Sequence, residues 1–491
     1  MLTPRQVRAA MAAVLMTTLL AALDQTVVSV AVPTIARQMG GLDWMAWVIS
    51  GYLIASTVVT PLYGKFSDVH GRQRLMTIAI LIFLLASAGC ALAQTMPQLV
   101  VARVLQGIGG GGLLAMAQTV VADVIAPRER GRWQGYIAIV WALASVLGPV
   151  IGGVLTQYLS WPWIFWINLP VGLVALVLAR TALGALRVPG QRARIDAGGA
   201  VLLLAGLTAF LLPVTRVGQG TPWNDGTNLA AWALAAVLLG GFVAAERRHL
   251  DPVVPLGLFA QPVVSAGCAL FFVCFFNFIA LTVLVPLRLQ MASGLDAADA
   301  AMRLLPLTLA IPTAAFVAGR WQYRTGRVLP AQRLGVLLVP PGLAAYALLP
   351  PEHLLAALAL VATGFGMGLQ MPTTLITVQL SVARPVMGTV TALTAFFRLL
   401  GGALGIAVYN SMVLFLLREH LPESTAVAGD ALASVLTHGT NATRLASDAA
   451  FRTVTLVAAA FALLSVWWVT RLPDVDASGR TAPALDGQAP R

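Results

Sequence analysis

Residues 64–74 read GKFSDVHGRQR and place a cluster of charged and polar side chains between two long apolar runs. Gly64 and Gly71 lie seven residues apart, Asp68 stands between them, and Arg72 follows the second glycine. A short basic stretch between two apolar runs is typical of the loops that join membrane spans. This stretch therefore predicts a helical membrane protein, and the rest of the chain tests that prediction.

The composition excludes an ordinary soluble domain. Hydrophobic residues make up 58% of the 491 residues and charged residues only 10%, whereas a soluble surface needs about a quarter charged residues. The net charge of +12 would suggest nucleic acid as a partner of a soluble domain, but here the basic residues lie between apolar runs and report topology. The three cysteines fall within apolar runs and lack the spacing of a metal site, so we expect no metal and no cofactor.

Fourteen apolar runs approach the length of about 20 residues that a membrane-spanning helix needs. With the N-terminus in the cytoplasm, 22 of the 31 Lys and Arg residues fall on cytoplasmic segments, 7 outside and 2 within spans. This asymmetry obeys the positive-inside rule and predicts that both termini are cytoplasmic. The longest external loop is expected at about 417–452. The spans are centred on residues 11–33, 45–63, 75–93, 98–121, 134–156, 162–179, 197–215, 229–245, 264–286, 301–319, 334–350, 354–379, 387–416 and 453–470.

The first span has an alternative interpretation as a cleaved signal peptide that ends near Ala21 and Ala22. The apolar run resumes from Val27 to Val32, so the segment is longer than a signal core. We therefore expect the first span to be retained.

An internal repeat divides the chain into two halves. At an offset of about 256 residues, Gly64-Lys65 and Gly71-Arg72 fall on Gly319-Arg320 and Gly326-Arg327, with the same spacing. Glycines of the fourth span fall on those at 364, 366 and 368 in the same order. The repeat predicts one six-span half in residues 1–190 and another in residues 261–472. Residues 191–260 would then carry two inserted spans, and residues 473–491 a disordered cytoplasmic tail.

Three charged residues within the predicted spans are candidates for function. Asp24 is the carboxylate placed well inside a span, and an acid there costs roughly 2.5–3.5 kcal/mol on insertion scales, so it normally marks an ion or substrate path. Arg103 and Arg398 are flanked by apolar residues and glycine, and each guanidinium needs acceptors or a wet cavity. A structural role, in which the side chains only fix neighbouring helices, is the alternative for all three.

Several motifs resemble those of the major facilitator superfamily, and in particular its 14-span drug:proton antiporters. Residues 64–74 resemble the signature loop after the second helix, and Arg103 begins the fourth-helix motif RVLQGIG. The fifth-helix motif of the antiporters is matched by Gly135 and by Gly148-Pro149 and Gly152-Gly153, with Ala144 in place of a glycine. Residues 23–33, 47–53 and 161–170 resemble the first, second and sixth spans of the 14-span family.

The resemblance implies a role for each group of residues. Asp24 and Arg103 would couple transport to protons, and Asp68 and Arg72 would form a gate with Asp123, whose alternative is a solvated helix end. In the second copy Tyr323 replaces the acid, so the first half is expected to carry the main gate. The expected helix-packing or cavity residues are Gly148, Pro149, Gly152, Gly153 and Arg398, and the gating glycines are Gly64 and Gly71. The residues Phe275, Phe276 and Asn277 would line the substrate cavity, or alternatively pack against lipid and other helices.

The resulting expectation is an all-α integral membrane protein with the major facilitator fold, in which two six-helix halves and two inserted helices give 14 transmembrane helices. It would export lipophilic small molecules such as drugs, dyes or antibiotics across the bacterial inner membrane in exchange for protons. The alternative is an exporter of one dedicated metabolite on the same fold. A membrane enzyme is disfavoured, because no cluster of His, Cys, Asp or Glu recurs at the end of a span. The resemblance also admits a periplasmic adaptor and an outer-membrane channel as partners.

Overall fold

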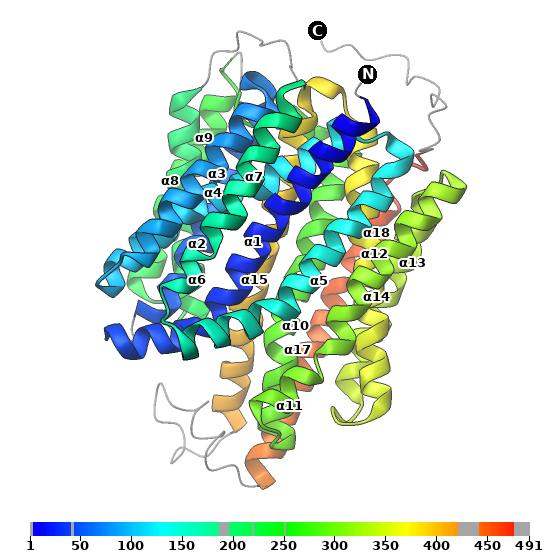
Figure 1. Ribbon diagram of the computed structural model, residues 1–491. Helices are drawn as coiled ribbons and strands as arrows, with labels where there is room; N and C mark the ends of the chain where they lie inside the picture. Colours follow the sequence, from blue (N-terminus) through cyan, green and yellow to red (C-terminus); the bar gives the residue numbers. More distant parts are fainter. Residues whose placement is uncertain are drawn as a thin grey trace.

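The computed structural model describes residues 3–40, 44–185, 196–218, 220–249, 252–420 and 441–475, and within them every regular element is a helix. The long helices run roughly parallel and antiparallel to one another in one bundle (Figure 1). The prediction of an all-α membrane protein is confirmed. The first half contains α1 (Pro4–Met39), α2 (Met45–His70), α3 (Arg72–Ala91), α4 (Met96–Val124), α5 (Pro127–Tyr158), α6 (Trp163–Trp166) and α7 (Asn168–Ala182).

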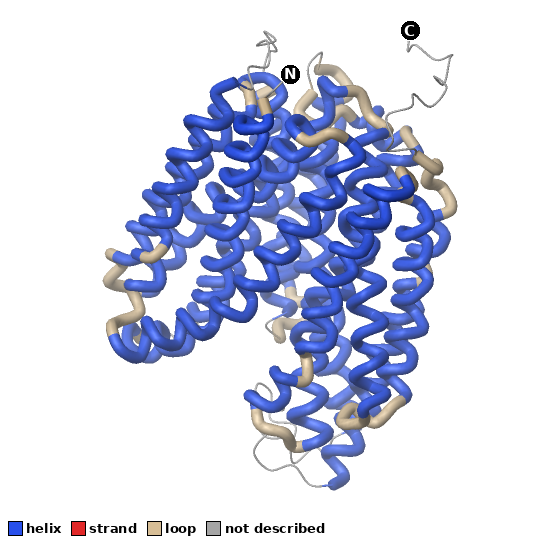
Figure 2. Tube along the Cα trace, turned by 45° about the vertical axis from the view of Figure 1, so that its right-hand side comes forward, coloured by secondary structure: helices blue, strands red, loops and turns tan. Residues whose placement is uncertain are grey.

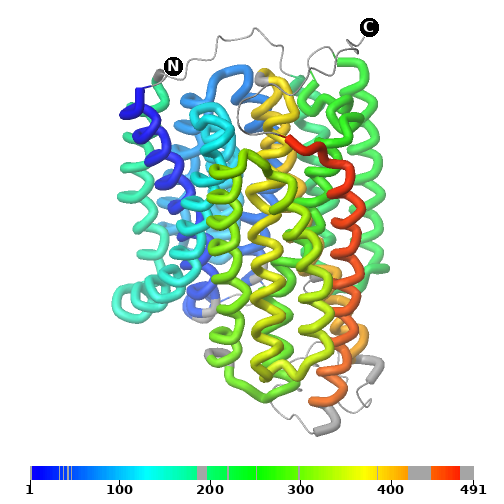
Figure 3. Tube along the Cα trace, turned by 90° about the vertical axis from the view of Figure 1, so that its right-hand side faces the viewer, coloured from blue at the N-terminus to red at the C-terminus, as the bar shows by residue number. Residues whose placement is uncertain are grey.

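Two helices follow the first half, and the second half begins after them. The inserted pair is α8 (Ala197–Gly218) and α9 (Gly226–Glu246), which pack on each other. The second half contains α10 (Pro262–Ser293), α11 (Ala297–Met302), α12 (Leu305–Thr325), α13 (Leu329–Leu348), α14 (Leu354–Leu380), α15 (Met387–His420), α17 (Asn441–Ala462) and α18 (Leu464–Val469). Helix α8 also packs against α2 and α15. In Figure 3 the last helices, α17 and α18, coloured orange to red, run along the bundle to the right of its centre.

Thirteen helical segments of the described chain are long and apolar enough to cross a membrane. The one predicted span not among these thirteen, the eleventh at residues 334–350, coincides with α13, which is helical over 20 residues. Its polar residues Gln332 and Arg333 and its internal prolines Pro340 and Pro341 lower its hydropathy. The helix packs against α14 and α17, so these two helices cover part of its surface.

Capping groups and prolines set the helix starts. Thr3 and Gln6 form a capping box at α1, and α4, α5 and α10 each begin with proline in the first turn. Asp225 caps α9 by accepting from the backbone N–H groups of Thr227 and Asn228. The Thr227 hydroxyl also donates to this carboxylate and lowers its pKa, as do the two N–H groups.

The two halves repeat the same helix pairings. Helix α1 packs on α5 and α10 on α15, while α4 packs on α2 and α3 as α14 packs on α12 and α13. The halves meet through α2 against α15 and α5 against α12. The repeat seen in the sequence therefore corresponds to a repeat of helix packing.

Two loop predictions were wrong. Residues 64–74 are almost entirely helical, because α2 continues to His70 and α3 begins at Arg72, and Gly71 alone breaks the helix with a φ of 89°. At 417–452, α15 runs to His420 and α17 begins at Asn441, so part of the predicted loop is helix. The remainder of that loop and most of the predicted tail, from residue 476, lie outside the described residues.

We call the end of the bundle that carries Gly71 and Gly326 the motif face, and the opposite end the far face. The helices of the two halves lie close together toward the motif face, at the top of Figure 2, and diverge toward the far face. At the motif face Gly319 touches Gly131, and a side chain at either glycine would overlap the other helix. The halves are thus closed against each other at the motif face.

Candidate functional site

Asp24 is fully buried and bonded on both carboxylate oxygens. Its Oδ2 accepts from Nη1 of Arg103 at 2.7 Å, and its Oδ1 accepts from the amides of Gln106 at 2.9 Å and Asn168 at 2.8 Å. Neither side chain of the ion pair is more than 2% exposed. Ser87 accepts from both amides and donates to the carbonyl of Phe165, which completes a connected polar network. The structure thus brings together the two residues that the sequence singled out separately.

Four helices position this network. Asp24 comes from α1, Ser87 from α3, Arg103 and Gln106 from α4, and Asn168 from the first residue of α7. The Arg103 guanidinium also donates to Gln106 and to the carbonyl of Val48, and it lies 4.3 Å from the ring centroid of Tyr52. A buried pair is tolerated only when its remaining hydrogen-bonding groups find partners, as they do here.

A small cavity leads to the ion pair. It holds about 100 Å³ and reaches the Arg103 side chain between α1 and α2. Asp24 itself is not among the lining residues, so the cavity gives access to the cationic partner and not directly to the carboxylate. The lining residues are Gln25, Val28, Ile49, Tyr52, Leu53 and Arg103.

The second candidate network lies at the motif face. Arg72 bonds Asp68 through Nη1 at 2.5 Å and Asp123 through Nε at 2.8 Å, and its side chain is 4% exposed. Asp68 comes from α2, Arg72 from the start of α3, and Asp123 from the end of α4. The three predicted gating residues therefore lie in direct contact. Gly71 supplies the positive φ that separates α2 from α3 and places Arg72 one turn after Asp68.

Asp68 also joins the two halves. Its oxygens accept from the backbone N–H groups of Gly388 at 3.2 Å and Thr389 at 2.8 Å, and from the Thr389 hydroxyl at 2.8 Å. These N–H groups belong to the first turn of α15, where the helix dipole favours a negative charge. Gly64 lies against the same turn, and a side chain there would overlap Ala392.

The second copy of the motif closes the same face with other chemistry. Arg128 of α5 donates to the carbonyl of Tyr323 at 2.9 Å and lies 5.7 Å from the centre of its ring. The Gln322 amide donates to the carbonyl of Pro127 at 3.1 Å. Tyr323, which replaces the acid, thus takes part in contacts between the halves without a carboxylate.

The predicted packing glycines of α5 fall into two groups. A Cβ at Gly148 would overlap the Thr26 side chain of α1, and one at Gly152 would press on the Val27 carbonyl. Gly153 has open space around its Cβ direction, so close packing does not require glycine there. Thr26 in addition donates to the carbonyl of Ala144 at 2.9 Å, across the same helix pair. Pro149 lies inside α5 and is exposed.

The three predicted substrate-cavity residues of α10 differ in exposure. Phe276 is 8% exposed and packs against Tyr409 and Phe461, with ring centroids 5.1 and 4.6 Å away. Asn277 is 1% exposed, donates to the carbonyl of Val273 and accepts from the Tyr409 hydroxyl. This packing favours the alternative of a helix-packing role for both. Phe275 remains half-buried, with Arg398 lying 5.3 Å from its ring centroid.

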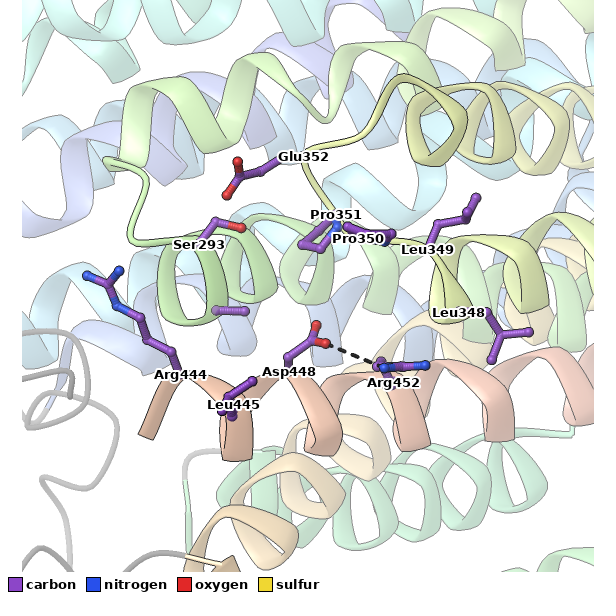
Figure 4. Close-up of a pocket in the computed structure, with 11 residues that line it drawn as sticks. Ser293, Leu348, Leu349, Pro350, Pro351, Glu352, Arg444, Leu445, Asp448 and Arg452 are labelled. Carbon is purple, nitrogen blue, oxygen red and sulfur yellow. Dashed lines mark ion pairs between the residues drawn. The ribbon is translucent and has the colours of Figure 1, made fainter. Parts of the chain in front are cut away.

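A further ion pair, in which only the arginine is buried, lies near the far face and was not predicted from the sequence. Arg288 of α10 bonds Asp448 of α17 at 2.9 Å and donates to the carbonyls of Tyr346, Ala347 and Leu349 at the end of α13. Asp448 also lines a pocket of about 290 Å³ together with Arg444, Arg452 and Glu352, as Figure 4 shows. Arg288 caps the carboxyl end of α13, where its cation complements the helix dipole.

The sequence contains only weak indications of the functional residues that were not predicted from it. Gln106 lies within the fourth-helix motif one turn after Arg103, and Asn168 lies within the sixth-span motif, yet neither is charged. Arg288 lies just beyond the predicted span 264–286, whereas α10 continues to Ser293. Among the described residues, no group of three or more His, Cys, Asp and Glu is placed to hold a metal ion.

Comparison with protein families identifies one match over most of the chain. The model of the Major Facilitator Superfamily matches residues 14–406. An uncharacterized MFS-type transporter of Mycobacterium tuberculosis is 34% identical over 412 residues, which cover 82% of this chain and 59% of that protein. The chain thus spans less than two thirds of the length of this relative. The multidrug transporter protein MdtP of Bacillus subtilis is 32% identical, over 80% of this chain and 72% of its own length.

Solved structures share the fold at low sequence identity. The human organic anion transporter structure has a TM-score of 0.66 at 17% identity and covers 95% of this chain and 100% of its own. The proton:xylose symporter XylE has a TM-score of 0.62 at 15% identity and covers 97% of this chain and 98% of its own. These likenesses support the architecture described above and carry no information on substrate.

Proposed function

Since this chain belongs to the major facilitator superfamily of membrane transporters, we propose that it exports lipophilic small molecules in exchange for protons by alternating access of its two halves. Relatives named as a multidrug transporter and as multidrug resistance protein 3, both of Bacillus subtilis, support the substrate class and the direction. The proposal places the motif face on the cytoplasmic side of a bacterial inner membrane, with both termini on that side. The reason is that most Lys and Arg residues fall on the segments at this face.

The buried pair of Asp24 and Arg103 is the observation that carries the proton coupling. An arginine stays charged in a protein, so a proton that arrives at this pair must be taken up by Asp24. Protonation would leave the Arg103 cation buried without its counter-ion, which costs free energy. A different arrangement of α1 and α4 could then be favoured, and proton binding would be coupled to the change of state.

The contacts at the motif face supply the gate in this proposal. With the motif face in the cytoplasm, the structure corresponds to the outward-facing state, closed on the cytoplasmic side. Asp68 holds that state by accepting hydrogen bonds from the first turn of α15. Arg72 holds the Asp68 carboxylate in place, and Asp123 neutralises part of the charge of Arg72. Opening to the cytoplasm would break these bonds and the contacts between Arg128 and Tyr323.

Efflux of fluorescent lipophilic dyes from a pump-deficient bacterial host, with and without a proton uncoupler, tests the proposal. Cells that express the protein should expel dye, and the uncoupler should stop efflux. Asp24→Asn should lower the rate at least about tenfold at equal protein level, because the side chain can no longer take up a proton. Asp299→Asn, which changes an exposed acid of α11, is the matched control. Uncoupler-sensitive efflux at the wild-type rate in Asp24→Asn would show that the coupling site is elsewhere.

A dedicated metabolite exporter is the second candidate. It is favoured by similarity to the Acurin A biosynthesis cluster MFS-type transporter of Aspergillus aculeatus, 32% identical over 83% of this chain and 76% of that protein. Competition in vesicles separates the candidates, because a dedicated carrier should ignore unrelated dyes. A multidrug exporter should show mutual inhibition among chemically dissimilar compounds.

A further inference from the structure

Arg398 differs from three buried arginines of the bundle. Arg72, Arg103 and Arg288 each form an ion pair with an aspartate. Within the described part of the chain, the Arg398 guanidinium has no counter-ion, and its observed partner is the ring of Phe275, 5.3 Å from its Cζ. A half-buried cation without a counter-ion is costly in a membrane protein unless water or a ligand solvates it.

The position of Arg398 rules out solvation from the membrane surface. It lies about eleven residues into the apolar segment Met387–Leu417, which is about 16 Å along the helix axis and close to the middle of a hydrocarbon core of about 30 Å. A side chain at that depth is too far from either interface to reach it. Arginines in this position face the interior of a bundle or a water-filled cavity.

The packing of α15 turns Arg398 toward α10. On this helix Gly388, Thr389 and Ala392 contact α2 of the first half. Arg398 lies six residues beyond Ala392, which is about 240° further around the helix at about 100° per residue, so it does not point at α2. Gly401 lies against the backbone of Phe272 on α10, and this close approach brings the Arg398 side chain onto Phe275.

The aromatic surface next to Arg398 is wider than one ring. Phe275 is in contact with Phe271 and Phe278, with ring centroids 6.4 and 5.7 Å away. Phe275 and Phe278 are half-buried, so part of each ring remains accessible. A fixed cation beside accessible aromatic rings suits a molecule with a carboxylate or sulfonate and a flat apolar body.

We propose that Arg398 and Phe275 form a binding subsite for amphipathic organic anions, in which the guanidinium bonds the acid group and the phenyl rings contact the apolar body. This inference rests on the proposed function and specifies its substrate class. The cation disfavours positively charged substrates by the same interaction, since like charges repel most strongly where water is scarce.

Equilibrium binding to the purified full chain in lipid nanodiscs tests the subsite with three naphthyl probes of similar size. The probes are radiolabelled 1-naphthoate, 1-naphthamide and 1-naphthylmethylammonium, which differ in charge. The wild-type protein should bind the naphthoate at least about tenfold more tightly than the amide, and the ammonium most weakly. Equal or tighter binding of the amide or the ammonium would overturn the proposal, as would a lack of naphthoate binding at millimolar concentration.

Variants assign the preference to the residues. Arg398→Gln should remove the difference between naphthoate and amide while amide binding stays within about twofold, and Arg398→Lys should keep part of the difference. Phe275→Leu should weaken both probes to a similar degree. Arg333→Gln removes an exposed arginine of the same half and should leave all three affinities unchanged. A charge preference that persists in Arg398→Gln would overturn the assignment.

Two controls keep the outcomes distinct. Size-exclusion profiles and thermal unfolding midpoints check that each variant folds. If Arg398→Gln does not fold, the binding comparison is made with Arg398→Lys. Failure of the proton-driven efflux assay with the anion preference intact would contradict the proposed function alone. Proton-driven efflux of dyes together with an absent anion preference would contradict this inference alone.

Discussion

The residue with the most consequence is Asp24, whose carboxylate is bonded by three side chains from two other helices. Each of these bonds crosses between helices of the first half. A change at one member therefore affects stability as well as transport, and the two effects need to be separated.

Removal of one partner from the ion pair should cost more stability than removal of both. Arg103→Gln leaves the Asp24 carboxylate buried without its cation, which we expect to cost about 3–5 kcal/mol. The double variant Asp24→Asn with Arg103→Gln removes both charges and should recover most of that loss, although it should not couple transport to protons. Thermal unfolding of the purified variants measures the effect. A double variant that is no more stable than Arg103→Gln would argue against an energetically coupled pair.

Asn168 should act as a positioning residue for Asp24. Its amide donates to Oδ1 of Asp24 and to Ser87, so Asn168→Leu should remove one hydrogen-bond donor from the buried carboxylate and slow uncoupler-sensitive efflux at equal protein level. The dependence of efflux on external pH should also change, because the proposed proton acceptor has lost a hydrogen bond. Efflux measured across a series of external pH values reports this change. An unchanged pH profile with a uniformly lower rate would indicate a purely structural role.

At the scale of the helix, close approach depends on particular glycines. The pairs of α1 with α5 and of α10 with α15 are built in the same way, since Gly148 lies against Thr26 as Gly405 lies against the Phe276 backbone. Within the same motif, Gly152 lies against Val27 of α1, whereas Gly153 has no atom within 4 Å of its Cβ direction. Only some glycines of the motif are therefore required for close packing.

Alanine at Gly148 and Gly153 should have opposite outcomes. Gly148→Ala places a methyl group where the Thr26 side chain lies, and overpacking of this kind typically costs about 1–3 kcal/mol. We expect lower thermal stability and slower efflux for Gly148→Ala. Gly153→Ala, in which the methyl group meets no atom within 4 Å, should match the wild type and serves as the control. Equal loss in both variants would mean that the helix backbone, and not the contact with α1, sets the requirement.

At the scale of the whole molecule, the proposed alternating access requires that the contacts at the motif face break in each cycle. These contacts combine the carboxylate of Asp68 on the N-terminus of α15 with the pairing of Arg128 and Tyr323 on the other side of the interface. The first network is ionic and the second depends on an aromatic ring and a backbone carbonyl.

A reversible cross-link between positions 128 and 323 should stop transport. Both residues are exposed and lie in contact, so cysteines there can be joined by a short thiosulfonate cross-linker after Cys90, Cys268 and Cys274 are replaced by alanine. Efflux should fall to background on cross-linking and return on reduction. The single-cysteine variants treated in the same way are the controls. Undiminished efflux in the cross-linked protein would contradict alternating access through opening of this face.

The sequence determined the class of the protein because its signals are local. The apolar runs required a membrane, and the spacing shared by Gly64 to Arg72 and Gly319 to Arg327 required a repeat. The stretch 64–74 was nevertheless predicted as a loop, because its charges suggested solvent. In the structure Asp68 and Arg72 pair with each other, Asp68 also bonds the first turn of α15, and α2 continues as a helix to His70.

Tertiary structure alone decided which polar residues meet. Nothing in the order of residues indicates that Asp24 and Arg103 form a pair with Asn168 bonded to the same carboxylate, because these residues are separated by 79 and 144 positions. The same holds for Arg288 with Asp448 and for Arg398, which has no counter-ion among the residues that the structure describes. The sequence neighbours of these arginines do not reveal either feature. A chain specifies locally how apolar a segment is, whereas the compensation of a buried charge depends on which helices pack around it.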